Sequence, residues 1–190
     1  MTMENQPHIT VIGAGLAGCE AAWAAAQRGV KVTLIEMKPQ RMTPAHHSAL
    51  FAELVCSNSL KAKRLDSAAG LLKEEMRRLG SVCVPAALSC AVPAGGALAV
   101  DRDRFAQNVT AAIRSHPLIA VEEREAAELP ADGVAVVATG PLTAQGLAAR
   151  LSERFGGALS FFDAAAPIVT AESIDMDSAY EASRYGKGTA

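Results

Sequence analysis

The sequence predicts an α/β domain with a mainly parallel sheet and a small additional β element. Three observations support this fold class. Residues 8–12 and 30–36 are short apolar segments rich in β-branched residues, which is typical of buried strands. The Ala-rich segment between them is predicted to be a helix that stops at Gly29. A glycine-rich turn joins the first strand to this helix, so the order is that of one βαβ unit, which pairs its strands in parallel.

The rest of the chain continues this alternation. The remaining expected elements are helices at 67–79, 101–116 and 142–157, a strand at 118–124 and a buried strand at 133–141. Residues 81–100 are predicted to form short strands, because prolines and a Gly-Gly turn interrupt an apolar stretch. Residues 37–65 form a long irregular connection, and long ordered loops are usually functional. Short strands and polar loop are expected beyond residue 158.

Two of the expected helices carry clear start signals. Asp66 or Ser67 can cap the helix at 67–79, whose apolar residues lie along one face. For the helix at 101–116, Asp101 and Asp103 are expected to cap and charge its first turn rather than to contact a cofactor. Phe155 is expected on the apolar side of the helix at 142–157.

Composition limits the possible functions. The chain has 190 residues, of which 50% are hydrophobic and 20% charged, enough for one sizeable domain. The net charge is −2 and no basic block stands out, so charge alone makes no case for nucleic-acid or membrane binding. No apolar run reaches the roughly 18 residues of a spanning helix, and the first residues lack a signal-peptide pattern. We therefore expect a cytoplasmic protein without a membrane anchor.

The four cysteines have neither CxxC spacing nor a partnering histidine pattern. They are Cys19, Cys56, Cys83 and Cys90. This pattern predicts thiols in a reducing compartment rather than disulfides, and it predicts no metal site. Cys19, beside a glycine of the first helix, is expected in the core, as are Cys83 and Cys90 on their strand-like segments.

The glycine turn has the context of a dinucleotide-binding fingerprint. Gly13 permits a sharp turn, Gly15 lets a pyrophosphate approach the backbone, and Gly18 allows close packing of the helix. The helix N-terminus then offers unpaired N–H groups to the phosphates. Glu36 ends the second strand, where a carboxylate can accept hydrogen bonds from ribose hydroxyls and repel a 2′-phosphate. The site therefore suits FAD or NAD rather than NADP.

The strand that ends in "VVATGP" favours FAD over NAD. An Ala-Thr-Gly turn after such a strand is a feature of flavoproteins of the two-dinucleotide type, in which it passes near the adenosine end of FAD. Thr139 and Gly140 would then lie at the carboxyl end of the strand, where open α/β sheets bind ligands. An ordinary turn between a strand and a helix is the alternative interpretation.

Longer motifs add a specific family resemblance over nearly the whole chain. They are "VIGAGLAGCEAAW", "EMKPQRMTPAHH", "FAELVCSNSLKA", "GLLKEEMRRLGS", "VPAGGALAVDRDRF", "VATGPLT", "FFDAAAPIV", "ESID" and "RYGKG". The chain resembles the folate- and FAD-dependent tRNA (uracil-5-)-methyltransferase family. A more distant resemblance is to the larger flavoprotein that helps to modify the wobble uridine of tRNA.

The resemblance implies an activity and its cofactors. Family members make 5-methyluridine in the T-loop of tRNA, with methylenetetrahydrofolate as the carbon donor. Reduced FAD carries the one-carbon unit and supplies electrons, which NADH or NADPH restores. The residues that match the family's FAD fingerprint are Gly13, Ala14, Gly15, Leu16, Ala17 and Gly18.

Cys56 matches the family's cysteine in the CSNS motif, and general chemistry gives it a role. C5 of uracil is a poor nucleophile, and a thiolate that adds to C6 makes C5 enolate-like, so that C5 attacks an electrophilic methylene. The alternative for Cys56 is a buried structural thiol.

The same loop contains two histidines, His46 and His47. They are candidates for proton transfer or for contact with phosphate, or they are solvated. Arg41 is a candidate contact to the cofactor or folate, or a surface arginine.

Family members are more than twice this length, so we expect residues 1–190 to be the N-terminal, FAD-binding part of a longer enzyme. The C-terminal half, an inserted domain and a second important cysteine are then absent, and the chain alone is expected to lack complete methyl-transfer activity. Other hypotheses are an FAD/NAD(H)-dependent oxidoreductase of a small molecule, the wobble-uridine relative, and a non-catalytic nucleotide-binding module. The tRNA surface, the folate site and the oligomeric state are not predicted.

Overall fold

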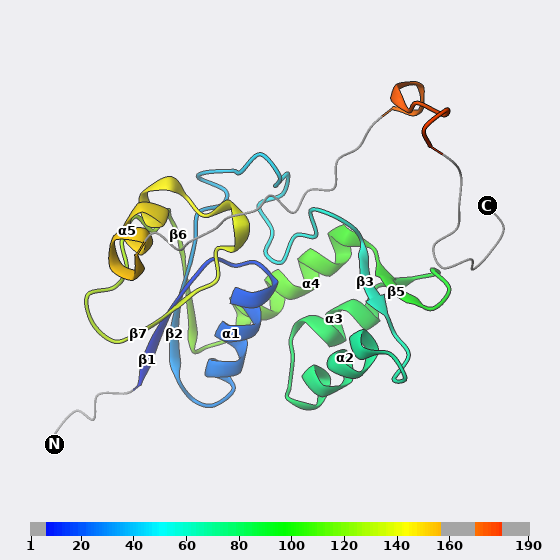
Figure 1. Ribbon diagram of the computed structural model, residues 1–190. Helices are drawn as coiled ribbons and strands as arrows, with labels where there is room; N and C mark the ends of the chain where they lie inside the picture. Colours follow the sequence, from blue (N-terminus) through cyan, green and yellow to red (C-terminus); the bar gives the residue numbers. More distant parts are fainter. Residues whose placement is uncertain (1–6, 157–169, 180–190) are drawn as a thin grey trace, which may run out of the picture.

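The computed structural model describes residues 7–156 and 170–179, and its centre is a four-stranded parallel sheet (Figure 1). Along the sheet the strands follow the order β6-β2-β1-β7. Their bounds are His8–Ile12 for β1, Lys31–Glu36 for β2, Ile119–Glu123 for β6 and Val134–Val137 for β7. Every neighbouring pair is parallel, with Val11 of β1 opposite Leu34 of β2. The predicted α/β fold with a mainly parallel sheet is confirmed, and its arrangement is Rossmann-like.

Helices cover both faces of this sheet. Helices α1 (Leu16–Ala26) and α4 (Arg102–Ser115) pack on one face, and α5 (Gln145–Phe155) packs on the other. Neighbouring residues of a strand point to opposite faces. Val11 of β1 therefore joins the core beneath α1 and α4, whereas Ile12 joins the smaller core beneath α5.

A second, three-stranded antiparallel sheet is the predicted small β element. Its order is β3-β5-β4, with bounds Ser59–Ala62, Ala97–Val100 and Ala91–Val92 respectively. Helices α2 (Ala68–Arg78) and α3 (Cys83–Ser89) lie beside it, on the side of the molecule away from α5 (Figure 1). Two short 3-10 helices, η1 (Gly140–Leu142) and η2 (Ala171–Ser173), complete the described elements.

The prediction of strands throughout residues 81–100 is wrong, because residues 83–89 form helix α3. The start of this helix is held from a distant part of the chain. The carboxylate of Glu20 on α1 accepts hydrogen bonds from Ser81 Oγ and from the backbone N–H of Cys83, the latter at 3.0 Å. Pro85 lies in the first turn, where a missing N–H costs nothing. An interaction between α1 and α3 thus decides the local structure.

Two expectations about burial also fail. The strand that ends at residue 137 was expected to be buried, but Val134 and Val137 of β7, an edge strand of the described sheet, are 60% and 39% exposed. Phe155, expected on the apolar side of α5, is exposed as well. The apolar face of α2 is also exposed, at Leu71, Leu72 and Leu79. Helix α2 instead packs through Gly70, where an added Cβ would lie 1.8 Å from the carbonyl oxygen of Arg64.

The predicted helix caps are confirmed. The Ser67 hydroxyl accepts a hydrogen bond from the Gly70 N–H at 3.1 Å, and Asp101 accepts one from the Arg104 N–H at 3.1 Å. No helix in residues 7–156 or 170–179 is long and apolar enough to cross a membrane. Most of the strands and loop expected beyond residue 158, with the motifs FFDAAAPIV and RYGKG, lie outside the described residues.

Candidate functional site

A cleft of about 250 Å³ opens at the carboxyl ends of the parallel strands. Segments that follow β1, β2, β6 and β7 line it, together with part of the long loop after β2. Its lining residues include Gly13, Gly15, Leu16, Ala17, Glu36, Lys38, Thr43, His46, Glu53, Val55, Glu125, Thr139 and Gly140. This is the edge at which open α/β sheets bind their ligands.

The glycine turn forms one wall of the cleft, and its three glycines differ in their surroundings. Gly13 has a φ of +99°, and a Cβ there would lie 2.7 Å from the carbonyl oxygen of Ala138. At Gly18 a Cβ would lie 1.7 Å from the carbonyl oxygen of Gly13, so only glycine lets α1 approach its own turn. A Cβ at Gly15 would meet nothing within 4 Å, which leaves open space over the backbone at the cleft.

The N-terminus of α1 points a set of N–H groups into this space. Gly15 is the N-cap residue, no side chain caps the helix, and its first turn contains no acidic residue. The first N–H groups of a helix have no partner within the helix, and its dipole gives this end a partial positive charge. The turn therefore fits the diphosphate of a dinucleotide such as FAD.

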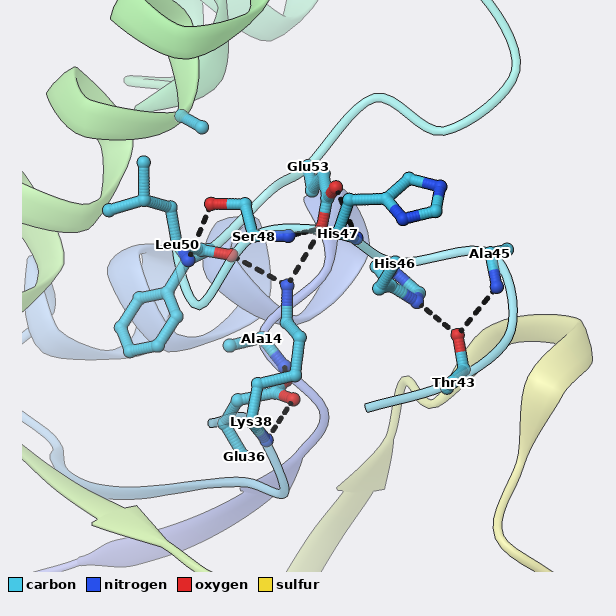
Figure 2. Close-up of polar contacts among 12 residues, drawn as sticks. Ala14, Glu36, Lys38, Thr43, Ala45, His46, His47, Ser48, Leu50 and Glu53 are labelled. Carbon is cyan, nitrogen blue, oxygen red and sulfur yellow. Dashed lines mark hydrogen bonds and ion pairs between the residues drawn. The ribbon is translucent and has the colours of Figure 1, made fainter. Parts of the chain in front are cut away.

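Glu36 lies beneath the turn and is 6% exposed. Its carboxylate accepts hydrogen bonds from the backbone N–H of Ala14 at 2.6 Å and of Lys38 at 2.9 Å (Figure 2). Each carboxylate oxygen has a second lone pair, so acceptor capacity for ribose hydroxyls is left. The structure adds a role that the sequence did not reveal, since Glu36 also joins the glycine turn to the loop after β2.

Lys38 and Glu53 form a second polar connection, which sequence analysis missed. The Lys38 side chain is buried, and its ammonium donates to the carbonyl oxygen of Leu50 at 2.6 Å and to Glu53 at 3.4 Å (Figure 2). Glu53 also accepts from the N–H groups of His47 and Ser48. The one sequence signal was an acid inside the apolar run at 51–55.

The pKa values of this loop follow from these contacts. Burial by itself raises the pKa of Glu53, but hydrogen bonds from His47 and Ser48 and the Lys38 charge outweigh it and lower the pKa. Burial, and next the Lys38 charge, lower the pKa of His46. Nδ1 of His46 lies 2.6 Å from the Thr43 hydroxyl oxygen, and His46 and Thr43 both line the cleft. His47 is exposed and does not line it.

Cys56 is exposed and directly follows a residue of the cleft lining. Val55, the residue before it, lines the cleft, whereas Cys56 itself does not. Phe51 and Ala52 are fully buried, and the Ala52 N–H donates to the carbonyl oxygen of Ala14 at 2.9 Å. The segment that leads to Cys56 is therefore bonded directly to the glycine turn.

The other three cysteines are buried, as predicted. The Cys19 thiol donates to the carbonyl oxygen of Ala14 at 3.3 Å, and burial, with Glu36 and Glu20 nearby, raises its pKa to about 12. Burial also raises the pKa of Cys83 and of Cys90. Cys83 lies on α3 and Cys90 is the residue that ends it, so the expectation of strand positions was wrong although the expectation of burial was right.

The remaining predicted site residues lie in two places, with Thr139 and Gly140 in the cleft lining and Arg41 outside it. Thr139 and Gly140 line the cleft at the end of β7, and Gly140 has a φ of +66°. The Arg41 side chain is 56% exposed and forms a 2.5 Å ion pair with Glu125. Glu125 lines the cleft and Arg41 does not. Within the described part of the chain, no group of three or more His, Cys, Asp or Glu residues is placed to hold a metal ion.

Comparison with known proteins agrees with the family resemblance. Residues 8–190 match the family described as Glucose inhibited division protein A. A methylenetetrahydrofolate–tRNA-(uracil-5-)-methyltransferase TrmFO from Geotalea uraniireducens is 61% identical over 180 residues, which are 95% of this chain and 41% of that protein. The proteins of the same name from Brevibacillus brevis and Symbiobacterium thermophilum are each 60% identical, over 98% and 97% of this chain.

The chain thus spans about two fifths of the length of these relatives, since it covers 43% of the Brevibacillus protein and 41% of the Symbiobacterium protein. These identities confirm the family resemblance that the sequence motifs indicated. The match over residues 8–190 and these identities together show that the chain belongs to the glucose inhibited division protein A family and corresponds to the N-terminal portion of its TrmFO members.

Proposed function

We propose that this chain is the FAD-binding part of a folate-dependent tRNA (uracil-5-)-methyltransferase. The observation that carries the proposal is the hydrogen bond between Ala52 and Ala14, which fastens the segment ending at Cys56 to the glycine turn. The segment that ends at the exposed Cys56 is thereby anchored beside the proposed nucleotide site. The names of the relatives that are about 60% identical supply the reaction.

In the proposed site, the N–H groups of Leu16, Ala17 and Gly18 bind the diphosphate of FAD, and Gly15 leaves room for it. Glu36 accepts from the ribose hydroxyls while it keeps its bonds to Ala14 and Lys38. When bound, the flavin supplies the electrons and the one-carbon carrier that methyl transfer from methylenetetrahydrofolate requires. NADH or NADPH is the proposed source of those electrons.

The proposed role of Cys56 is covalent activation of the uracil base. Its thiolate adds to C6, which converts C5 into an enolate-like nucleophile for the methylene group. The exposed position of Cys56, next to Val55 of the cleft lining, supports this role, because a base presented by a tRNA has to reach the sulfur. Arg41, tied to Glu125 at the cleft, is the proposed contact to folate or cofactor.

We further propose that the remaining length of the enzyme, as in the TrmFO relatives, completes the active site, and that residues 1–190 alone do not sustain turnover. The names of the TrmFO relatives support tRNA as the proposed substrate, and a reactive thiol supports the cytoplasm, a reducing compartment, as the proposed location. A small-molecule oxidoreductase remains the competing function, since a glycine turn and an acid at the end of β2 are shared by many flavoproteins.

Two measurements test the proposal. Purified chain incubated with FAD and desalted is expected to retain flavin absorbance, and absence of bound flavin contradicts the cofactor assignment. In the protein extended to the length of its relatives, Cys56→Ala is expected to abolish methylation of tRNA while flavin absorbance persists. Methylation at the parent rate in Cys56→Ala contradicts the role of the thiol, and oxidation of NADH without tRNA methylation by the parent favours the small-molecule oxidoreductase.

A further inference from the structure

A cluster of lysines lies on the segment that continues from Cys56. Residues 59–73 contain four basic residues and one acidic residue, although the chain as a whole is slightly acidic. Arg64 forms an ion pair with Asp66 at 2.9 Å and is thereby neutralised. Lys61 and Lys63 are both exposed, and among the described residues neither forms an ion pair with a carboxylate. Two uncompensated positive charges therefore face solvent on or just beyond β3.

A third ammonium group lies close to Lys61. Lys73 of α2 donates to the carbonyl oxygens of Leu60 and Ala69, at 2.7 and 2.6 Å, so its charge is held against β3. Burial, followed by the charge of Lys61, lowers the pKa of Lys73. Bringing like charges together costs free energy that an anionic ligand can recover. Among the described residues, none of these three ammonium groups forms an ion pair with a carboxylate that would balance its charge.

The backbone of β3 is irregular at the same place. Ser59 pairs with Ala99 and Ala62 with Ala97, so two residues of β3 oppose the single residue Leu98 of β5. Lys61, one of these two, has a φ of +65°, in the left-handed region that non-glycine residues rarely adopt. Bulges of this kind redirect a side chain and are common beside functional sites. The bulge therefore holds Lys61 in a strained backbone conformation on β3.

We infer that Lys61 and Lys63 bind the phosphate backbone of the RNA whose base reaches Cys56. This inference rests on the proposed function, from which the identity of the RNA as tRNA follows. Lys61 is five residues beyond Cys56, so their Cα atoms lie within about 18 Å of each other. Phosphates a few nucleotides from a base held at Cys56 lie within that range, and lysine binds them as a mobile point charge.

The salt dependence of RNA binding tests this surface. The chain and its Lys61→Gln/Lys63→Gln variant are titrated with an unmodified tRNA transcript from about 50 to about 200 mM salt. Each phosphate contact that is lost is expected to reduce the slope of log K against log salt by roughly 1, so the double variant should lose up to about 2. The Lys61→Arg/Lys63→Arg variant keeps both charges and should retain the slope.

Lys31→Gln is the matched control, because Lys31 is an exposed lysine at the opposite, amino end of the parallel sheet. An unchanged slope in the Lys61→Gln/Lys63→Gln variant, an equal loss in Lys31→Gln, or no RNA binding by the parent overturns the inference. The inference is also overturned if the Lys61→Gln/Lys63→Gln variant loses binding to phosphatidylserine vesicles but keeps its binding to RNA. That result would indicate a membrane-binding surface instead. Flavin absorbance is measured on every sample, so that failure to bind FAD, which contradicts the proposed function, is scored separately.

Discussion

The thiol of Cys56 lies at the surface, whereas the thiols of Cys19, Cys83 and Cys90 are buried. Near pH 8 the native chain is therefore expected to react quickly with one equivalent of an aromatic disulfide reagent. Burial keeps Cys19, with its pKa of about 12, in the unreactive thiol form. In denaturant four equivalents should react, and Cys56→Ala should remove the fast reaction. Rapid modification of several thiols in the native chain would show that the core around α1 and α3 is open.

Glu53 is expected to contribute stability that depends on pH. Glu53→Gln keeps the shape of the side chain but removes the charge that faces Lys38 and the N–H groups of His47 and Ser48. Loss of these charged hydrogen bonds should cost about 1–3 kcal/mol at pH 7, measured by urea unfolding. The control is Glu128→Gln, because the Glu128 side chain is 72% exposed and such changes stay within about 0.5 kcal/mol.

The sign of the pH dependence follows from the lowered pKa of Glu53 in the folded chain. The contribution of Glu53 is fully present above its ordinary pKa of 4.5 and is lost as the pH falls through the lower folded-state value. The difference between the parent and Glu53→Gln should therefore shrink below about pH 4.5. A difference that stays constant into the acid range would mean that packing, rather than charge, holds the loop.

Among the elements, the glycine turn offers a matched pair of substitutions. Gly18→Ala places a Cβ 1.7 Å from the Gly13 carbonyl oxygen, so α1 has to move away from the turn. Gly18→Ala is therefore expected to lower the free energy of unfolding by about 3 kcal/mol or more. This loss outweighs the preference of alanine over glycine for the helix, which is about 1 kcal/mol. Thermal unfolding measures the loss, and a variant as stable as the parent would contradict the observed close packing.

Gly15→Ala is the counterpart that separates binding from folding. A Cβ at Gly15 meets nothing within 4 Å, and its φ of −71° suits any residue, so stability should change by less than about 0.5 kcal/mol. The added methyl group occupies the space proposed for the diphosphate, so the affinity for FAD should fall at least about tenfold. Flavin fluorescence titration measures this affinity. If Gly15→Ala binds FAD as tightly as the parent, the diphosphate does not bind at the glycine turn.

At the scale of the whole molecule, ligand binding should be visible as global stabilisation. Free FAD at a hundred times its Kd adds about 2.7 kcal/mol to folding, which raises the Tm of a chain of this size by roughly 5–10 °C. NADP is expected to stabilise the chain much less than FAD, because Glu36 repels a 2′-phosphate at the glycine turn. Scanning calorimetry with each ligand distinguishes them, and equal stabilisation by NADP would contradict the proposed role of Glu36.

Local sequence patterns predicted those parts of the fold that depend on near neighbours. The βαβ unit at residues 8–36, the glycine turn and the caps at Ser67 and Asp101 all follow from residue order, because turn geometry and helix capping act over three or four residues. The placement of Glu36 at the end of β2 was predicted for the same reason.

Contacts between distant segments decided the rest. Helix α3 exists where strands were expected because Glu20 caps it from 63 residues away. The exposure of Cys56, the buried Lys38 beside Glu53, and the uncompensated charges of Lys61 and Lys63 likewise depend on which segments meet in space. Burial and ion pairing are properties of the folded surroundings. Residue order alone therefore determined the βαβ unit and its glycine turn, whereas the tertiary structure determined the exposure of the thiol and of the lysines around them.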